Sequence, residues 1–202
     1  MRKFYWIAFL CLIIVLGFTT QFFVRRANEP VQPKTKHTQK IEPLQNIDNR
    51  VTKKPFGIFI TKENSPVQPE RFSGYHTGTD FETTAEEANS EVPFYAVCDG
   101  KILQKRAASG YGGVLVQTCQ IQSQDVTVIY GHVSLKSINK NIGDNLTAGD
   151  KIGILGQPPD ETDGERKHLH LGIHKGTAVN ILGYAQSLSA LVNWLDYEKI
   201  TK

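Results

Sequence analysis

Seven short apolar runs, separated by turn-forming residues, constrain the fold of this chain more than any other feature. The turns carry pairs such as Asp99-Gly100, Gly112-Gly113 and Gly149-Asp150, which favour tight reversals of the backbone. Many short strands joined in this way predict a mainly β domain, built as a compact antiparallel β-sandwich or open barrel. The predicted strands are residues 56–60, 94–98, 101–105, 114–118, 126–132, 151–155 and 168–174.

One segment near the C-terminus has the spacing of a helix instead. Leu188, Leu191, Val192 and Leu195 recur at intervals that place them on one helical face within residues 184–197. We therefore predict a short C-terminal helix that closes the domain.

The first 54 residues differ in composition from the rest. Residues 4–24 contain no charged side chain and end at Arg25, and a helix of that length spans a bilayer core of about 30 Å. We predict an uncleaved N-terminal membrane anchor over residues 1–24, because the apolar run is longer than that of a signal peptide. Residues 25–54, rich in Pro, Gln and Lys, predict a basic linker unable to bury a core. The folded domain is then residues 55–202.

The net charge of +3 is unevenly divided along the chain. Residues 1–24 carry +2 and residues 25–54 carry +5, which leaves −4 on residues 55–202. A mildly acidic domain is poorly suited to bind a phosphate backbone, so we expect no nucleic acid partner.

Cys98 and Cys119 both lie in strand-like stretches, and two interpretations stay open. The pattern fits a cross-strand disulfide if the domain is exported, and it fits two buried free thiols equally well. Neither cysteine has another close to it in sequence, which argues against a cysteine-based metal site.

Three stretches far apart in sequence concentrate the histidines of the domain. His76 and Asp80 lie in the first, His132 in the second, and His168 and His170 in the third. Imidazole and carboxylate groups are ligands that zinc takes in catalytic sites. Any one of these histidines alone is more commonly a surface or hydrogen-bonded residue. The three stretches together, each beside strand and turn residues, predict a metal-dependent hydrolase.

Strand periodicity predicts which of these side chains share a face. Residues two apart in a strand point the same way, so His168 and His170 should lie side by side. By the same rule Tyr130 and His132 should share one face. His174 continues the alternation of the third stretch, but it lies beyond the reach of an ion bound at His170.

His76 and Asp80 require a different argument. Four residues of straight strand span about 13 Å, which is too far for both side chains to bind one ion. We therefore predict a bend at Gly78, through backbone angles that other residues avoid. Glu82 follows in the same segment and is interpreted as a solvated strand residue.

Six blocks of sequence follow one another in a fixed order. They are Gly74-Tyr75-His76-Thr77-Gly78-Thr79-Asp80, Phe94-Tyr95-Ala96-Val97-Cys98-Asp99-Gly100-Lys101-Ile102, Gly110-Tyr111-Gly112-Gly113, Tyr130-Gly131-His132, Gly149-Asp150-Lys151-Ile152-Gly153 and His168-Leu169-His170-Leu171. In this order they resemble the M23 family of zinc metallopeptidases, the lysostaphin/LytM-like cell-wall endopeptidases. The resemblance covers roughly residues 56–175.

The resemblance implies a zinc metalloendopeptidase that hydrolyses peptide bonds in peptidoglycan, on a lysostaphin-like fold with a groove over the metal. Carried over by position, His76, Asp80 and His170 would hold one Zn²⁺ ion per domain. His132 and His168 would be catalytic histidines that do not bind the metal. The expected partners are a peptidoglycan peptide as substrate and the membrane through the N-terminal helix, and we expect a monomer. Residues 158–167 are charged where many members carry a Gly/Ser/Thr-rich turn, so the bond that is cut stays open.

The charge around the predicted anchor gives conflicting signals about orientation. Two Lys/Arg precede the apolar run and five follow it within residues 25–40, which by the positive-inside rule keeps the domain in the cytoplasm. The order of basic start, apolar run and folded domain is that of an export signal, and a cell-wall substrate also requires export. We expect a single-pass protein of the bacterial cytoplasmic membrane, with its catalytic domain on the extracytoplasmic side. Secretion after signal cleavage is the alternative.

Two other classes of function compete with this interpretation. A catalytically silent M23-like domain that binds or activates another cell-wall hydrolase typically lacks a ligand position, whereas all five candidates are present here. A membrane-tethered adaptor of the lipoyl-like type is suggested by strand–turn pieces such as Asp99-Gly100-Lys101, but it leaves the histidines without a role. Metal analysis of the purified protein separates the silent domain from the enzyme.

Overall fold

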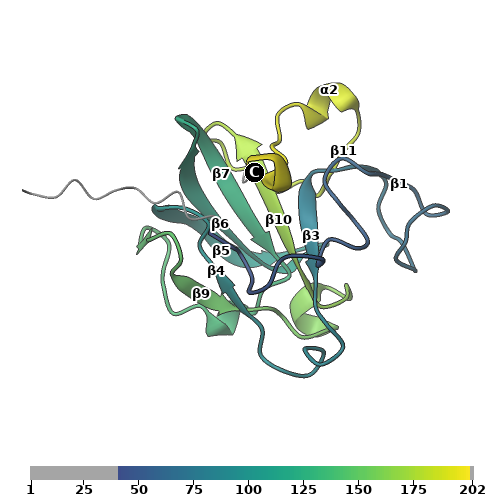
Figure 1. Cartoon of the computed structure of the whole chain (residues 1–202), viewed down its shortest axis with the longest axis horizontal. Coiled ribbons are helices and arrows are strands. Elements are labelled where there is room, and N and C mark those ends of the chain that lie inside the picture. The colour runs from purple at the N-terminus through teal and green to yellow at the C-terminus, as the bar shows by residue number, and fades with distance from the viewer. Residues whose placement is uncertain (1–40, 201–202) are drawn as a thin grey trace, which may run out of the picture. The chain divides into compact units, whose positions relative to one another are not determined.

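Antiparallel strand pairing dominates the computed structural model, which describes residues 41–200 (Figure 1). The largest sheet has the strand order β3-β10-β7-β6-β5-β8. These strands are β3 Gly78–Glu82, β10 His168–Lys175, β7 Gln124–Gly131, β6 Gly112–Ile121, β5 Gly100–Ala108 and β8 Asn145–Leu146. A mainly β antiparallel fold is therefore confirmed.

Two smaller sheets and a few single helical turns complete the described part of the chain. The three-stranded sheet has the order β1-β2-β11, and β4 pairs with β9. Their bounds are β1 Phe59–Ile60, β2 Gly74–His76, β11 Tyr184–Ala185, β4 Pro93–Tyr95 and β9 Lys151–Ile154. The helical turns are η1 Leu135–Ser137, η2 Asp160–Thr162, α2 Leu188–Leu191 and α3 Tyr197–Ile200. Each of the seven predicted runs overlaps a strand.

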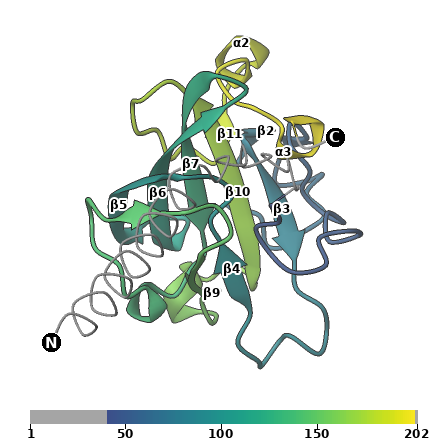
Figure 2. The ribbon, with the colours of Figure 1, turned by 60° about the vertical axis from the view of Figure 1, so that its left-hand side comes forward.

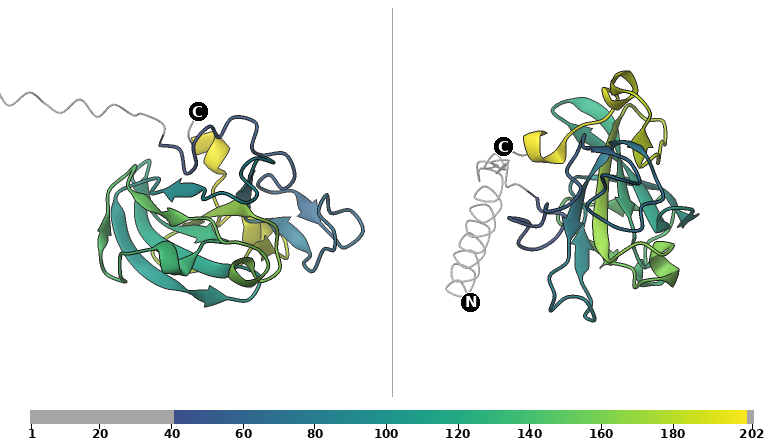
Figure 3. Two further views of the ribbon diagram at one scale, coloured as in Figure 1. Left: turned by 90° about the horizontal axis from the view of Figure 1, so that it is seen from below. Right: turned by 90° about the vertical axis from the view of Figure 1, so that its right-hand side faces the viewer.

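The main hydrophobic core covers one face of the six-stranded sheet. Leu115, Tyr130 and Leu171 lie opposite one another on β6, β7 and β10, and Phe94 and Leu155 pack against the same cluster from β4 and the end of β9. Figure 3 shows the curvature of this sheet from two sides. The opposite face carries a smaller cluster, made by Tyr111, Val114, Val116, Ile129 and Trp194. Because alternate residues of a strand point to opposite faces, the side chains on this second face do not belong to the main core and can form a site.

Residues 41–54 belong to the packed domain and do not form the solvated linker that their composition predicts. Leu44 and Ile47 are buried in the main core. The Arg50 guanidinium donates to both carboxylate oxygens of Glu87, at 2.7 and 2.8 Å. Residues 41–54 contain too few apolar side chains to form a core of their own. Those few side chains nevertheless pack into the core that the sheet forms.

Replacing Leu44 with alanine is expected to lower the free energy of unfolding by about 2–5 kcal/mol, because a fully buried leucine leaves a cavity. The matched control is Leu188→Ala, since Leu188 is 61% exposed and its truncation is expected to change stability by less than about 0.5 kcal/mol. Denaturant unfolding of the two variants measures both effects. Equal losses would contradict the packing of residues 41–54 onto the domain.

The predicted helix within residues 184–197 is confined to one turn, α2. The segment contains β11 and the single turn α2, and its backbone pairs elsewhere: Tyr184 lies opposite His76, and Trp194 forms a bridge to His174. These tertiary pairings use the backbone groups that a continuous helix would need. Leu188 is consequently exposed instead of facing the core.

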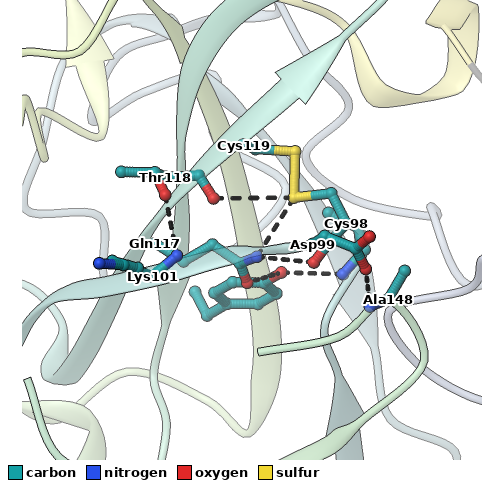
Figure 4. Close-up of a disulfide and its surroundings, with 9 residues drawn as sticks. Cys98, Asp99, Lys101, Gln117, Thr118, Cys119 and Ala148 are labelled. Atoms are coloured by element: carbon teal, nitrogen blue, oxygen red, sulfur yellow. Dashed lines mark hydrogen bonds between the residues drawn. A yellow bond between two sulfur atoms is a disulfide. The ribbon is translucent and has the colours of Figure 1, made fainter. Parts of the chain in front are cut away.

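A disulfide joins Cys98 to Cys119, with 5.9 Å between their Cα atoms (Figure 4). It ties the segment after β4 to the middle of the six-stranded sheet. The Gln117 side chain donates to the Cys98 carbonyl at 2.8 Å and accepts from the Tyr130 hydroxyl at 2.9 Å. Of the two interpretations that the sequence left open, the structure has the disulfide.

The predicted anchor, residues 1–24, and the start of the predicted linker lie outside the described residues. Within residues 41–200, no helix has both the length and the apolar character needed to cross a bilayer.

Candidate metal centre

Strand register brings Asp80 and His170 together. Strands β3 and β10 lie side by side (Figure 2). In this antiparallel pair, His170 lies directly opposite Asp80, and His168 lies opposite Glu82. On its other side His170 lies opposite Gly131 of β7. All of these positions fall on the face opposite the main core, as the predicted alternation of His168 and His170 requires.

His76 reaches the same place from the neighbouring sheet. It ends β2, and its Nε2 atom lies 3.1 Å from His170 Nδ1 and 3.3 Å from Asp80 Oδ1. His170 Nδ1 lies 3.0 Å from Asp80 Oδ1. Zinc ligands at about 2.0–2.1 Å in a tetrahedron stand about 3.3 Å from one another. The three atoms therefore have the spacing of three corners of a tetrahedral zinc site.

The surroundings of His76 support the assignment of its ligand atom. His76 Nδ1 lies 3.2 Å from the Pro55 carbonyl, which can only accept, so Nδ1 carries the proton and Nε2 is free to bind a metal. His170 Nε2 is buried and has no hydrogen-bond partner. Two imidazoles and one carboxylate form a donor set that suits zinc. Among residues 41–200 this is the one such group of His, Cys, Asp and Glu side chains.

Gly78 is needed for a different reason from the one predicted. The chain leaves one sheet and enters the next at Thr77, between β2 and β3, and Gly78 is not among the residues with positive φ. A Cβ at Gly78 would lie 2.6 Å from Cε1 and Nε2 of His170. The bend is real, but the glycine makes room for the imidazole ring and does not supply an unusual backbone angle.

His132 and His168 stand beside the three candidate ligands. Their ring centroids are 4.2 Å apart, and His168 Nε2 lies 3.2 Å from Asp80 Oδ2. His132 follows the end of β7 with φ of 60°, in the left-handed region, so strand alternation stops before it. The prediction that Tyr130 shares its face is therefore wrong: Tyr130 is in the main core, while His132 turns toward the other histidines.

The electrostatics of the cluster favour the protonation states that metals require. Burial lowers the pKa of His170 to about 4, despite its hydrogen bond to Asp80. Burial alone raises the pKa of Asp80, but the attraction of His168 and His76 outweighs it and holds this pKa well below its ordinary value. At neutral pH His170 is then a neutral imidazole and Asp80 an ionised carboxylate. Burial, together with the repulsion between a proton on His132 and one on His168, also lowers the pKa of His132 well below its usual value.

A groove of about 510 Å³ opens over these five side chains, which is large enough for several residues of a peptide. Two tyrosines on its walls were not foreseen. The Tyr111 ring lies 5.3 Å from that of His170, and its hydroxyl is buried without a partner. The Tyr184 ring lies 5.4 Å from that of His76. Tyr111 belongs to a turn that the sequence singled out, whereas nothing in the sequence distinguishes Tyr184.

Comparison with known proteins agrees with the geometry. The family model described as Peptidase family M23 matches residues 74–181, which is more than half of the chain and includes all five candidate site residues. This chain belongs to peptidase family M23. The fold is similar to that of the catalytic domain of lysostaphin from Staphylococcus simulans, with a TM-score of 0.51 and 19% identity over 79% of this chain and 98% of that one.

Two further similar proteins differ in how much of them is matched. Endolysin 2638A of Staphylococcus phage 2638A is 30% identical over 118 residues, which are 58% of this chain and 23% of the endolysin. The chain thus spans about a quarter of the length of that curated relative. The solved structure of LytU matches with a TM-score of 0.48 and 24% identity, over 75% of this chain and 90% of that one.

Proposed function

We propose that this M23 domain is a zinc metalloendopeptidase that hydrolyses peptide bonds in peptidoglycan. The observation that carries the proposal is the convergence of His76 Nε2, Asp80 Oδ1 and His170 Nδ1 to 3.0–3.3 Å from one another under the groove. Three protein ligands leave zinc a fourth position, which is the arrangement of catalytic sites. Zinc bound there would polarise the scissile carbonyl and make a water molecule more acidic.

His168 and His132 would carry out the proton transfers and stabilise the oxyanion of the tetrahedral intermediate. His168 Nδ1 lies 2.8 Å from the Arg166 carbonyl, which can only accept, so the proton sits on Nδ1. Nε2 is then the atom that can exchange a proton with the substrate or with water. His132 is buried against it and reaches the same end of the groove.

The cellular place of the reaction is a second part of the proposal. We place the domain on the extracytoplasmic side of a bacterial cytoplasmic membrane, held by the apolar run of residues 4–24. The Cys98–Cys119 disulfide favours an oxidising compartment and argues against the cytoplasm. Protease added outside spheroplasts should digest the domain without lysis; full protection until lysis would contradict this location.

The proposal is tested with the full chain and purified peptidoglycan. Zinc-loaded protein should release fragments whose masses correspond to a hydrolysed peptide bond, and a chelator should stop the release until zinc is returned. Intact cross-links after incubation with zinc-loaded protein, or release that a chelator does not affect, would overturn it. Stimulation of a separate cell-wall hydrolase by a protein that cleaves nothing would support the catalytically silent alternative.

A further inference from the structure

Arg166 touches the candidate metal site from outside. It comes two residues before β10, at the end of the charged loop 158–167. Its Nη2 atom donates to Asp80 Oδ2 at 2.9 Å. Its Nε atom donates to both carboxylate oxygens of Glu82, at 3.0 and 2.9 Å, and Nη2 also contacts Glu82 Oε1. One guanidinium thus bridges two carboxylates of the same strand.

The two oxygens of Asp80 have different neighbours. Oδ1 faces the nitrogen atoms of His76 and His170, at 3.3 and 3.0 Å. Oδ2 faces away from them, toward Arg166 and His168 at 2.9 and 3.2 Å. A carboxylate held in this way offers one oxygen to a metal and keeps the other occupied.

Glu82 completes the arrangement and corrects the sequence interpretation. It was interpreted as a solvated residue, but it is buried beside His168 on the face that carries the site. Because Asp80 and Glu82 are two apart in β3, their negative charges lie on the same face. Arg166 neutralises one of them and connects both, and its planar fork makes two directed bonds that a lysine cannot make together.

We propose that Arg166 is a positioning residue, which fixes Asp80 so that a single carboxylate oxygen faces the metal, and that Glu82 holds Arg166 in place. The inference rests on the proposed zinc site. Contacts that orient a metal ligand from outside are commonly worth about 10–100-fold in metal affinity. The Arg166–Glu82 pair would therefore set how tightly this domain holds zinc.

If Arg166 acted only through its charge, its removal would raise the affinity for zinc, whereas a positioning role predicts a lower affinity. The two explanations can therefore be told apart. Removing the Arg166 cation leaves Glu82 paired with Lys53 alone, at 3.4 Å, and adds negative charge near the site. This should strengthen the binding of a divalent cation. The decisive variant is the charge-balanced double substitution Arg166→Gln with Glu82→Gln, which removes the pair without changing the net charge. We expect it to bind zinc about 10–100-fold more weakly than the native protein. The Arg166→Lys variant keeps the charge and loses the planar fork, so its zinc affinity should lie between that of the native protein and that of the double variant.

A second Arg–Glu pair on the groove provides the matched control. Arg71 Nη2 lies 2.9 Å from Glu165 Oε1, in the same charged loop, and no hydrogen bond or ion pair joins either residue to a candidate ligand. The double variant Arg71→Gln with Glu165→Gln should bind zinc as the native chain does. Zinc affinity of the full chain is measured by competition with a chromogenic chelator.

Cobalt substitution gives a readout that a merely structural role would not change. The visible spectrum of the Co²⁺ form reports the coordination of the ion, so it should differ from native in the Arg166/Glu82 variant and not in the Arg71/Glu165 variant. Zinc affinity within about threefold of native, with an unchanged cobalt spectrum, would overturn the inference while the proposed function stands. A native chain that binds no zinc would overturn both.

Discussion

Replacing His170 with alanine is expected to abolish zinc retention and peptidoglycan cleavage together. His170 contributes Nδ1, which lies 3.0 Å from Asp80 Oδ1 and 3.1 Å from His76 Nε2. Its loss leaves two of three protein ligands. Since contacts that only orient a ligand are worth about 10–100-fold in metal affinity, loss of the ligand itself should weaken binding by more than about 100-fold. Metal analysis after gel filtration and fragment release from peptidoglycan measure the two effects.

The same strand offers the control for this variant. His174 lies four residues further along β10, on the same side of the strand, and contacts Trp194 at a ring distance of 4.8 Å. His174→Ala should keep one zinc ion per chain and native cleavage. Equimolar zinc and full cleavage in the His170→Ala variant would refute the assignment of His170 as a ligand.

The strands and the pairing of the site residues could be predicted from sequence for one physical reason. Side chains in a strand alternate with a period of two, so the pattern His168-Leu169-His170-Leu171 already implies two histidines over two core leucines. The segments β2 and β3 were found only as a motif, because residues 74–82 contain few of the apolar residues that mark a strand. Their pairing with β10 is a tertiary property.

What the sequence could not predict depends on close tertiary packing. The left-handed backbone of His132 cannot be deduced from alternation, which assumes a continuing strand. The need for glycine at position 78 comes from the ring of a residue 92 positions later. The pairing of Arg166 with Glu82 joins residues that composition alone leaves as ordinary surface charges.

The predictions for residues 41–54 and for most of residues 184–197 failed for a shared reason. Composition treats residues 41–54 as a solvated linker, and periodicity treats residues 184–197 as a helix. Neither composition nor periodicity takes into account the sheet on which these segments pack. Leu44 is buried in the main core that the sheet forms, and Tyr184 is extended because β2 offers an edge for β11. Tertiary contacts override local propensity where they pair the backbone with another strand or bury the apolar side chains in an existing core.

Replacing His168 or His132 with alanine is expected to lower kcat by about 10²–10⁴-fold while zinc stays bound. Neither side chain is one of the three candidate ligands, so metal content should separate these variants from His170→Ala. The Arg166 carbonyl keeps a proton on His168 Nδ1, at 2.8 Å, so Nε2, which lies 3.2 Å from Asp80 Oδ2, is the atom that takes up and releases a proton. We therefore expect His168 to act as the base and His132 as the hydrogen-bond donor to the oxyanion.

Glutamine substitutions distinguish these two roles. A glutamine amide can donate a hydrogen bond but cannot take up a proton at neutral pH. His132→Gln should therefore recover part of the activity that His132→Ala loses, whereas His168→Gln should be as inactive as His168→Ala. Steady-state rates of the four zinc-loaded variants on a soluble peptidoglycan peptide provide the measurement. Recovery of activity by His168→Gln and not by His132→Gln would exchange the two roles. Undiminished kcat in both alanine variants would exclude both histidines from the mechanism, because proton transfer would then proceed without either ring.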